Sequence, residues 1–310
     1  MSSSIIAGSL SAAVGIAPAL PPIRECGDSV AYRFLLAMGS RGGYRQAMLV
    51  DTHCHLDPHY FPEGALAVMD RASAVGVSGF VVIGVGADLA PARFAADLAA
   101  RHPSRVRASV GIHPHDATSL NEHSLQELTT LAQRPQVAFV GEIGLDYHYD
   151  HSPRAQQHET FRRLVQLARV VRKPIVVHTR EAREDTLAIL EEEGARDVGG
   201  IIHCFSEDRS FATRALDLGF YLSFSGIVTF KKSLDIQDVA TWAPAERIRV
   251  ETDAPYLAPM PYRGKPCEPA MVVHTARKVA ELRGISEAEL AVQTTKNART
   301  LLGDSAFAVG

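Results

Sequence analysis

The sequence has few cysteines and no long apolar segment. Its four cysteines are scattered and form no C-x-x-C pair: Cys26, Cys54, Cys204 and Cys267. This pattern argues against a disulfide-stapled fold and favours a reducing compartment, so we expect a cytoplasmic protein. No apolar run approaches the roughly 18 residues that a transmembrane helix needs, so we expect no membrane contact.

An excess of positive charge is also missing. The chain has 32 Lys and Arg against 35 Asp and Glu, which gives a formal net charge of −3. This balance excludes a strongly basic nucleic-acid coat protein, so any contact with nucleic acid has to come from a local basic patch. Nothing in the sequence indicates a stable protein partner.

Charged residues are absent from the beginning of the chain, where the first is Arg24. A secretory signal starts with basic residues, so a cleaved signal is the less favoured alternative here. Residues 1–46 are rich in Ser, Ala, Gly and Pro. We expect a weakly ordered extension, or a translated segment upstream of a true start at Met48. We expect one folded domain over residues 47–304 and a short tail over residues 305–310.

From residue 47 onward, short β-branched runs alternate with helical stretches. Between two such runs, "HETFRRLVQLARVV" places Phe161, Leu164, Val165, Ala168 and Val171 on one helical face. Near-continuous apolar runs of this length are typical of parallel strands covered on both faces. We expect strands at residues 48–53, 79–85, 106–113, 137–144, 174–179, 199–205, 220–226 and 247–253. Eight alternations predict an α/β fold of the (β/α)₈ TIM-barrel type, with a doubly wound open sheet as the alternative.

Five of the predicted strands end in residue types that commonly bind metal ions. These residues are His53 and His55 at the first strand, Glu142 at the fourth, His178 at the fifth, His203 at the sixth and Asp253 at the eighth. In TIM barrels the carboxyl ends of the strands form the active-site face. Each residue alone has an ordinary structural explanation, but together they predict a metal site at one end of the barrel.

The "HCH" spacing at the end of the first predicted strand allows both of its histidines to bind the same ion. Residues i and i+2 of a strand point to the same side, so His53 and His55 can bind one ion. The same alternation predicts that Cys54 points outward, and that Cys204 points outward beside an inward His203. We therefore expect both cysteines to pack in the core.

Several motifs together resemble a known family. "DTHCHLD", "GIHPH", "GEIGLDY", "HTR", "IIHCFS" and "ETDAPYLAP" occur in the order found in the TatD-related metal-dependent deoxyribonucleases, over about residues 48–303. The resemblance implies a distorted (β/α)₈ barrel with two divalent ions. It implies that His53 and His55 hold one ion with Asp253, that His178 and His203 hold the second, and that Glu142 bridges the two.

The resemblance also implies catalytic roles for two of these residues. Asp253 would accept the proton of the attacking water, and Glu142 would hold both ions in place. The metal is expected to be Zn, Mn or Mg, and the four histidines favour a transition ion over Mg. The substrate is expected to be DNA.

Substrate contacts are expected from five residues around the same mouth. A guanidinium binds a phosphate with two parallel hydrogen bonds, and Arg180 follows His178 by two residues. The other candidates are His115, Arg263, Lys265 and Asp146, and Asp146 is alternatively expected to orient a ligand or a neighbouring histidine, or to support the structure. The family commonly has "RGKRNEP", whereas this chain has Pro266 and Cys267 after Lys265, which puts contacts from this loop in doubt.

These features predict a metal-dependent hydrolase of ester bonds, most simply a deoxyribonuclease that acts on single strands or from strand ends. One alternative is an amidohydrolase-type enzyme acting on amides, lactones or small phosphoesters. Many dinuclear amidohydrolases bridge their ions with a modified lysine at the end of strand four, but Glu142 stands there, and Lys173 is expected at the opposite end. A second alternative is a non-catalytic barrel that binds nucleic acid or a partner.

Overall fold

Eight apolar runs form eight parallel strands that pair in chain order around one sheet, β1-β2-β3-β4-β5-β6-β7-β8. The computed structural model describes residues 48–302 and 307. The strands are β1 (Leu49–Cys54), β2 (Val77–Val85), β3 (Val106–Gly111), β4 (Val137–Asp146), β5 (Ile175–Arg180), β6 (Gly200–Ile202), β7 (Phe220–Phe224) and β8 (Ile248–Val250). The predicted (β/α)₈ barrel is confirmed, whereas the predicted boundaries at residues 46 and 304, the extension and the whole tail except Phe307 lie outside the described residues.

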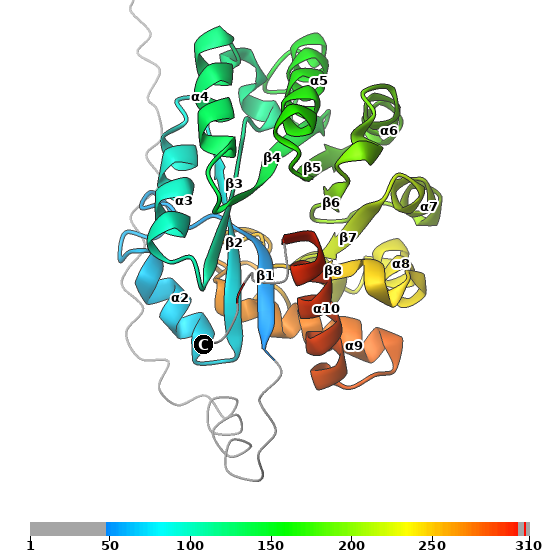
Figure 1. The fold of residues 1–310 in the computed structure, drawn as a ribbon. Coiled ribbons are helices and arrows are strands. Elements are labelled where there is room, and N and C mark those ends of the chain that lie inside the picture. The colour runs from blue at the N-terminus through cyan, green and yellow to red at the C-terminus, as the bar shows by residue number, and fades with distance from the viewer. Residues whose placement is uncertain (1–47, 303–306, 308–310) are drawn as a thin grey trace, which may run out of the picture. The chain divides into compact units, whose positions relative to one another are not determined.

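Helices follow the strands and pack around the outside of the sheet (Figure 1). They are α2 (Ala65–Ser73), α3 (Ala90–Arg101), α4 (Glu122–Ala132), α5 (Arg154–Val171), α6 (Arg183–Glu192), α7 (Arg209–Asp217), α8 (Leu234–Trp242), α9 (Val272–Arg283) and α10 (Glu287–Leu302). Short 3₁₀ turns lie at η1 (Pro114–Ser119), η2 (Ala195–Asp197), η3 (Gly226–Thr229), η4 (Ala245–Arg247) and η5 (Pro269–Met271). None of the helices within residues 48–302 is both long and apolar enough to cross a membrane.

The two predicted strands at residues 199–205 and 247–253 are too long. Their sheet pairing ends at Ile202 and Val250, and the chain then bends. Cys204 has φ 45° and Asp253 has φ 61°, which is left-handed backbone that cannot continue a strand. Asp253 N donates to His53 O at 2.9 Å, so β8 and β1 are joined by this bond beyond the end of the β8 ladder.

The core has an outer and an inner layer. In the outer layer the predicted face of α5 is buried at Phe161, Leu164, Val165 and Ala168, while Val171 is only partly buried. The inner layer lies inside the barrel and is formed by Val50, Val81, Ile83, Phe139, Val176, Ile201 and Tyr221, with Ala298 and Phe307. Large side chains from seven positions on the strands fill the barrel, so it is a packed core and not a channel.

Helix α10 lies across β1 and β8 (Figure 1). Thr295 Oγ1 donates to Met48 O at 2.6 Å, immediately before β1. The amide of Asn297 donates to Ile248 O at 2.7 Å, at the start of β8. These bonds place α10 over the amino ends of the strands, which leaves the carboxyl ends as the open face.

Gly144 allows β4 and β5 to approach closely. It has φ +147°, and a Cβ atom built there would lie 1.9 Å from His178 O. We expect Gly144→Ala to lower the free energy of unfolding by about 3 kcal/mol or more, because the added atom forces two paired strands apart. Urea unfolding measures this.

Gly219→Ala is the matched control for Gly144→Ala. Gly219 also has a positive φ, +88°, but nothing lies within 4 Å of its added Cβ. It should lose only about 1 kcal/mol, which is the cost of a side chain on left-handed backbone. Equal losses in the two variants would contradict the steric argument.

Candidate metal centre

The predicted ligands meet at the carboxyl ends of the strands, around the carboxylate of Glu142. Glu142 Oε2 lies 3.3 Å from His53 Nε2. Its other oxygen, Oε1, lies 2.9 Å from His178 Nδ1 and 3.4 Å from His203 Nε2. The two carboxylate oxygens therefore face different histidines, which is the arrangement that a bridging ligand requires.

Glu142 is almost completely buried, at 3% exposure. Burial by itself raises the pKa of this carboxyl, but the imidazoles of His203 and His113 outweigh it and hold the pKa well below its usual range. The carboxylate is thus ionised at neutral pH. A buried negative charge needs a nearby positive charge to balance it.

A second group of ligand atoms is formed by His53, His55 and Asp253, as the H-x-H spacing predicted. Asp253 Oδ1 lies 3.6 Å from Nε2 of each of the two histidines. The bond from Asp253 N to His53 O holds the two chain segments together. His53 on β1 and His55, which directly follows β1, thus face one carboxylate from the segment after β8.

The donor set fits divalent cations. Both ring nitrogens of His53 are buried and have no hydrogen-bond partner among the described residues, which costs about 1–3 kcal/mol for a buried polar atom. Burial opposes a charged His203, but Glu251 and Glu142 raise its pKa to about 10. The site thus attracts positive charge, and a metal ion bound to imidazole nitrogens would supply it in place of protons.

Two buried carboxylates support the ligands, and the sequence argument gave neither of them a role. Glu251 Oε1 lies 2.8 Å from His203 Nδ1 and accepts a hydrogen bond from Cys204 N at 2.6 Å. Asp51 Oδ2 accepts from Thr252 Oγ1 at 2.6 Å, which joins β1 to the segment after β8. Carboxylates behind ligating histidines fix ring orientation. Glu251 could have been found because it lies two residues before Asp253.

His113 lies closer to the centre than the sequence indicated. Its Nε2 is 3.5 Å from Glu142 Oε1, and its ligand atom groups with those of Glu142 and His178. Burial lowers the pKa of His113 to about 4, so the ring is neutral and able to bind a metal ion. His113 was not among the ligands predicted from the sequence. The "GIHPH" motif was the available signal for it.

Asp146 lies beneath two histidines. Its Oδ2 is 3.1 Å from His178 Nε2 and 3.1 Å from His115 Nε2, and the residue is 1% exposed. Burial raises the pKa of Asp146, but the hydrogen bond to His178 outweighs this, and the pKa is below its usual range. The structure therefore places Asp146 as a partner that orients His178 and His115, whereas His115 remains partly exposed at the mouth.

The two cysteines of the motifs differ in orientation. Cys54 is fully buried in the outer core layer, as predicted. The prediction for Cys204 is wrong: its sulfur groups with the ligand atoms of His203 and Asp253 and lies 3.2 Å from Ser225 Oγ. The physical reason is the left-handed backbone at Cys204, which ends the strand alternation on which the prediction depended.

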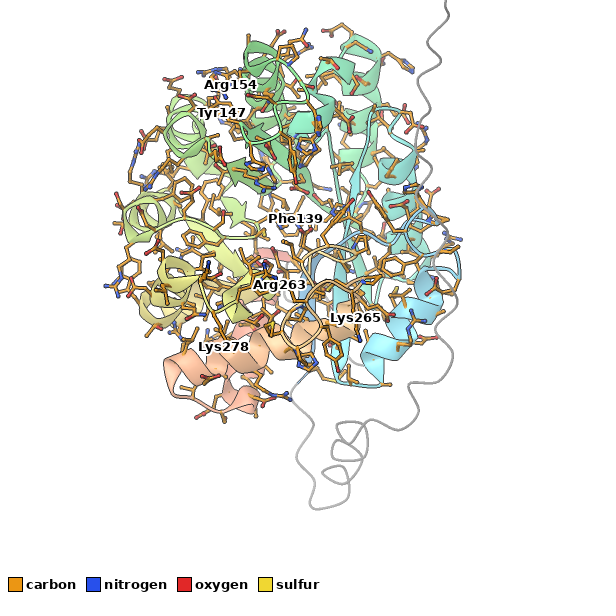
Figure 2. All side chains as sticks on the ribbon, turned by 180° about the vertical axis from the view of Figure 1, so that it is seen from behind. Phe139, Tyr147, Arg154, Arg263, Lys265 and Lys278 are labelled. Atoms are coloured by element: carbon orange, nitrogen blue, oxygen red, sulfur yellow. The ribbon has the colours of Figure 1, made fainter. Side chains whose placement is uncertain are left out.

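The predicted cationic contacts are exposed around the mouth and its loops. Arg180 lies over the Tyr149 ring, 4.7 Å from its centroid, and has no ion pair within the described part of the chain. Arg263 lies over the Phe230 ring at 4.5 Å and Lys265 over Tyr262 at 6.0 Å. Figure 2 shows Arg263 and Lys265 on the side seen from behind Figure 1.

Cys267, which replaces the usual Asn of the loop motif, is buried in the core and donates its backbone N–H to Pro255 O at 3.0 Å.

The position of Lys173 bears on the amidohydrolase alternative. Lys173 Nζ donates to Arg134 O at 2.8 Å and contacts the carbonyl of Val137, the first residue of β4. Lys173 therefore lies at the amino end of the barrel, as predicted, and cannot bridge ions held at Glu142.

Comparison with known proteins gives consistent matches over the barrel. The family model described as TatD related DNase matches residues 50–303. An Escherichia coli protein described as an uncharacterized metal-dependent hydrolase, YcfH, is 43% identical over 252 residues, which cover 80% of this chain and 93% of the relative. A Klebsiella pneumoniae relative described as a 3'-5' ssDNA/RNA exonuclease, TatD, is 33% identical over 260 residues, or 82% of this chain and 98% of the relative. The crystal structure of the Escherichia coli TatD homologue YjjV matches with a TM-score of 0.75 and 26% identity, covering 83% and 98% of the two chains.

Proposed function

This chain belongs to the TatD-related DNase family of metal-dependent hydrolases, and from that membership and the geometry of its centre we propose that it hydrolyses DNA phosphodiester bonds. We propose that it acts on single-stranded segments or from strand ends. The observation that carries this proposal is Glu142, whose two oxygens face different histidines within one buried group. The name of the Klebsiella pneumoniae relative supports a nucleic-acid substrate.

We propose that two divalent ions, Zn, Mn or Mg, bind here. His53, His55 and Asp253 would hold one, His178 and His203 the other, and Glu142 both. When bound, such ions polarise the phosphate and lower the pKa of water. Asp253 is 9% exposed, so its carboxylate can accept the proton of the attacking water at the open face. His113 is a further ligand candidate beside His178.

We propose that Arg180, Arg263 and Lys265 contact the phosphates of the strand, with His115 at the edge of the mouth. For about 2–4 phosphate contacts, log K for single-stranded DNA should fall against log[salt] with a slope of roughly −1.5 to −3. Arg180→Ala should weaken binding and reduce the slope by about 0.7, as fluorescence anisotropy at several salt concentrations would measure. Arg209→Ala, which removes an exposed guanidinium paired with Asp238, should leave the slope unchanged.

The central test uses the purified full chain, freed of metal and then supplied with Mn, Zn or Mg. We expect release of nucleotides from single-stranded DNA and slower release from duplex DNA, because an unpaired strand reaches ligand groups buried at one mouth more easily. We expect no release with EDTA, because EDTA removes the metal ions. The same assay is run with RNA, an amide and a lactone as further substrates. Hydrolysis of the amide or lactone with DNA and RNA left intact would favour the amidohydrolase alternative.

A further inference from the structure

Among the tyrosine, phenylalanine and tryptophan residues that the structure describes, the most exposed are Tyr149 at 51%, Tyr256 at 48% and Trp242 at 39%. Trp242 ends α8, away from the metal centre, and the Arg209 guanidinium lies over its ring at 5.3 Å. The other two border the open face of the barrel. Large exposed apolar groups that gather at one site are typical of ligand contact.

Tyr256 forms one side of the mouth. Its ring centroid lies 6.1 Å from that of His55, and its hydroxyl donates to the Tyr60 hydroxyl at 2.8 Å. The Tyr60 ring is also 6.1 Å from His55 and packs edge-on against Tyr256 at 5.8 Å. Tyr256 N donates to Asp253 O at 2.8 Å. The ring is thus fixed beside a candidate metal ligand and three residues after the candidate base.

Tyr149 forms another side. Its ring lies 5.4 Å from His115 and is parallel to His151 within 3° at 5.5 Å. The Arg180 guanidinium lies over this ring at 4.7 Å. Tyr149 N donates to Asp146 Oδ1 at 2.9 Å, which ties the loop to the residue that orients His178. The Tyr149–Arg180 pair therefore presents a planar cation on top of an aromatic ring.

The two surfaces lie on opposite sides of the centre. Tyr256 follows β8 and Tyr149 follows β4, and these strands are four positions apart in an eight-stranded barrel. The candidate ligands come from the ends of β4 and β8 themselves, at Glu142 and Asp253, and from the ends of strands between them, at His53 and His178. A phosphodiester at the centre would have its two neighbouring nucleosides directed toward these two surfaces.

We propose that Tyr256 and the Tyr149–Arg180 pair stack against the nucleobases on either side of the cleaved phosphodiester. This inference rests on the proposed function and specifies its substrate as unpaired nucleotides. Rings and guanidinium planes stack on any base because every base has a π-face, so the contact selects unpaired strands without reading sequence. Bases inside a duplex are stacked on their neighbours and cannot take these positions.

The test combines protein variants with abasic substrates. Tyr256→Ala and Tyr149→Ala are assayed on single-stranded oligonucleotides that carry a tetrahydrofuran in place of one base at a time. On the intact strand we expect KM, and Kd from fluorescence anisotropy, to rise about 5- to 100-fold for each variant. On the strand that lacks the base facing the altered residue, variant and wild type should differ by less than about twofold.

Two control variants test whether the position and the ring of the altered side chain cause the effect. Trp242→Ala removes the exposed ring that lies away from the centre and should change neither constant, and Tyr256→Phe should keep most of the affinity because it keeps the ring. Tyrosine variants that behave like Trp242→Ala on intact strands would overturn the proposal, while turnover by the wild type would leave the proposed function standing. An equal loss of kcat on intact and abasic strands would also overturn it, since the rings would then act on the metal centre.

Failure of the proposed function has a separate signature. If the wild type cleaves no nucleic acid with any metal, the anisotropy measurement still decides the inference. Weaker binding of intact strands by both alanine variants, absent on abasic strands, would support base stacking. Binding that the two tyrosines do not affect would overturn it.

Discussion

Asp253→Asn is expected to lower kcat on single-stranded DNA by about 10³- to 10⁴-fold and to change Kd less than threefold. The amide keeps the shape of the side chain but cannot accept the proton of the attacking water, a contribution of about 10²- to 10⁴-fold by itself. Asp253 Oδ1 also lies 3.6 Å from both His53 and His55, so loss of its charge weakens the binding of one ion. Single-turnover rates and anisotropy separate the two effects.

The matched control for Asp253→Asn is Asp70→Asn. Asp70 is an exposed carboxylate on α2 that pairs with Arg105 at 2.9 Å, and its loss should leave kcat unchanged. Metal content is measured on both variants. A kcat for Asp253→Asn within tenfold of wild type, with metal restored, would rule out Asp253 as the base.

Glu142→Gln should have the second large effect. It is expected to reduce bound metal from two equivalents to well below one and to lower kcat by at least about 10³-fold. The reason is geometric: Oε2 faces His53 while Oε1 faces His178 and His203, so one residue serves both ligand groups. His53→Ala and His178→Ala should each leave about one equivalent, because each removes a ligand from one group only. Elemental analysis of the purified proteins gives the metal content.

His123→Ala provides the control for these variants, since His123 is exposed on α4 and lies in no ligand group of the described residues. Its metal content and kcat should equal those of wild type. Two results would contradict the dinuclear arrangement. One is a wild-type protein that never holds more than one equivalent in excess metal, and the other is a Glu142→Gln variant that keeps two.

The fold could be predicted because its strands are short apolar runs and its helices have a clear 3.6-residue period. The joint position of His53, Glu142, His178 and Asp253 followed from one rule, that parallel strands end on the same side of a barrel. The prediction for Cys204 failed because it depended on a backbone angle that the residue type does not indicate. Cys204 has a left-handed φ without being glycine, so alternation could not place its sulfur.

The supporting carboxylates were missed for a related reason. Asp51 on β1 accepts a hydrogen bond from Thr252 Oγ1 beyond the β8 ladder, whereas Glu251, just after β8, contacts Cys204 N and His203 Nδ1 after β6. The Asp51 contact joins residues 201 positions apart, and the contact between Glu251 and Cys204 joins residues 47 positions apart, so periodicity within one strand does not predict either contact. His113 had a visible signal, but its distance to Glu142 depends on the approach of β3 to β4.

The junction of β1 with β8 also sets an order of assembly during synthesis on the ribosome. His53 and His55 leave the ribosome 200 residues before Asp253, which at 5–20 residues per second is about 10–40 s. Helix α10, which bonds to the chain beside β1 and β8, is made later still. Until Asp253 has been translated, β1 therefore lacks the segment that bonds to His53 O, and a ribosome that stalls before that point would hold a chain in which His53 and His55 have no Asp253 carboxylate to face.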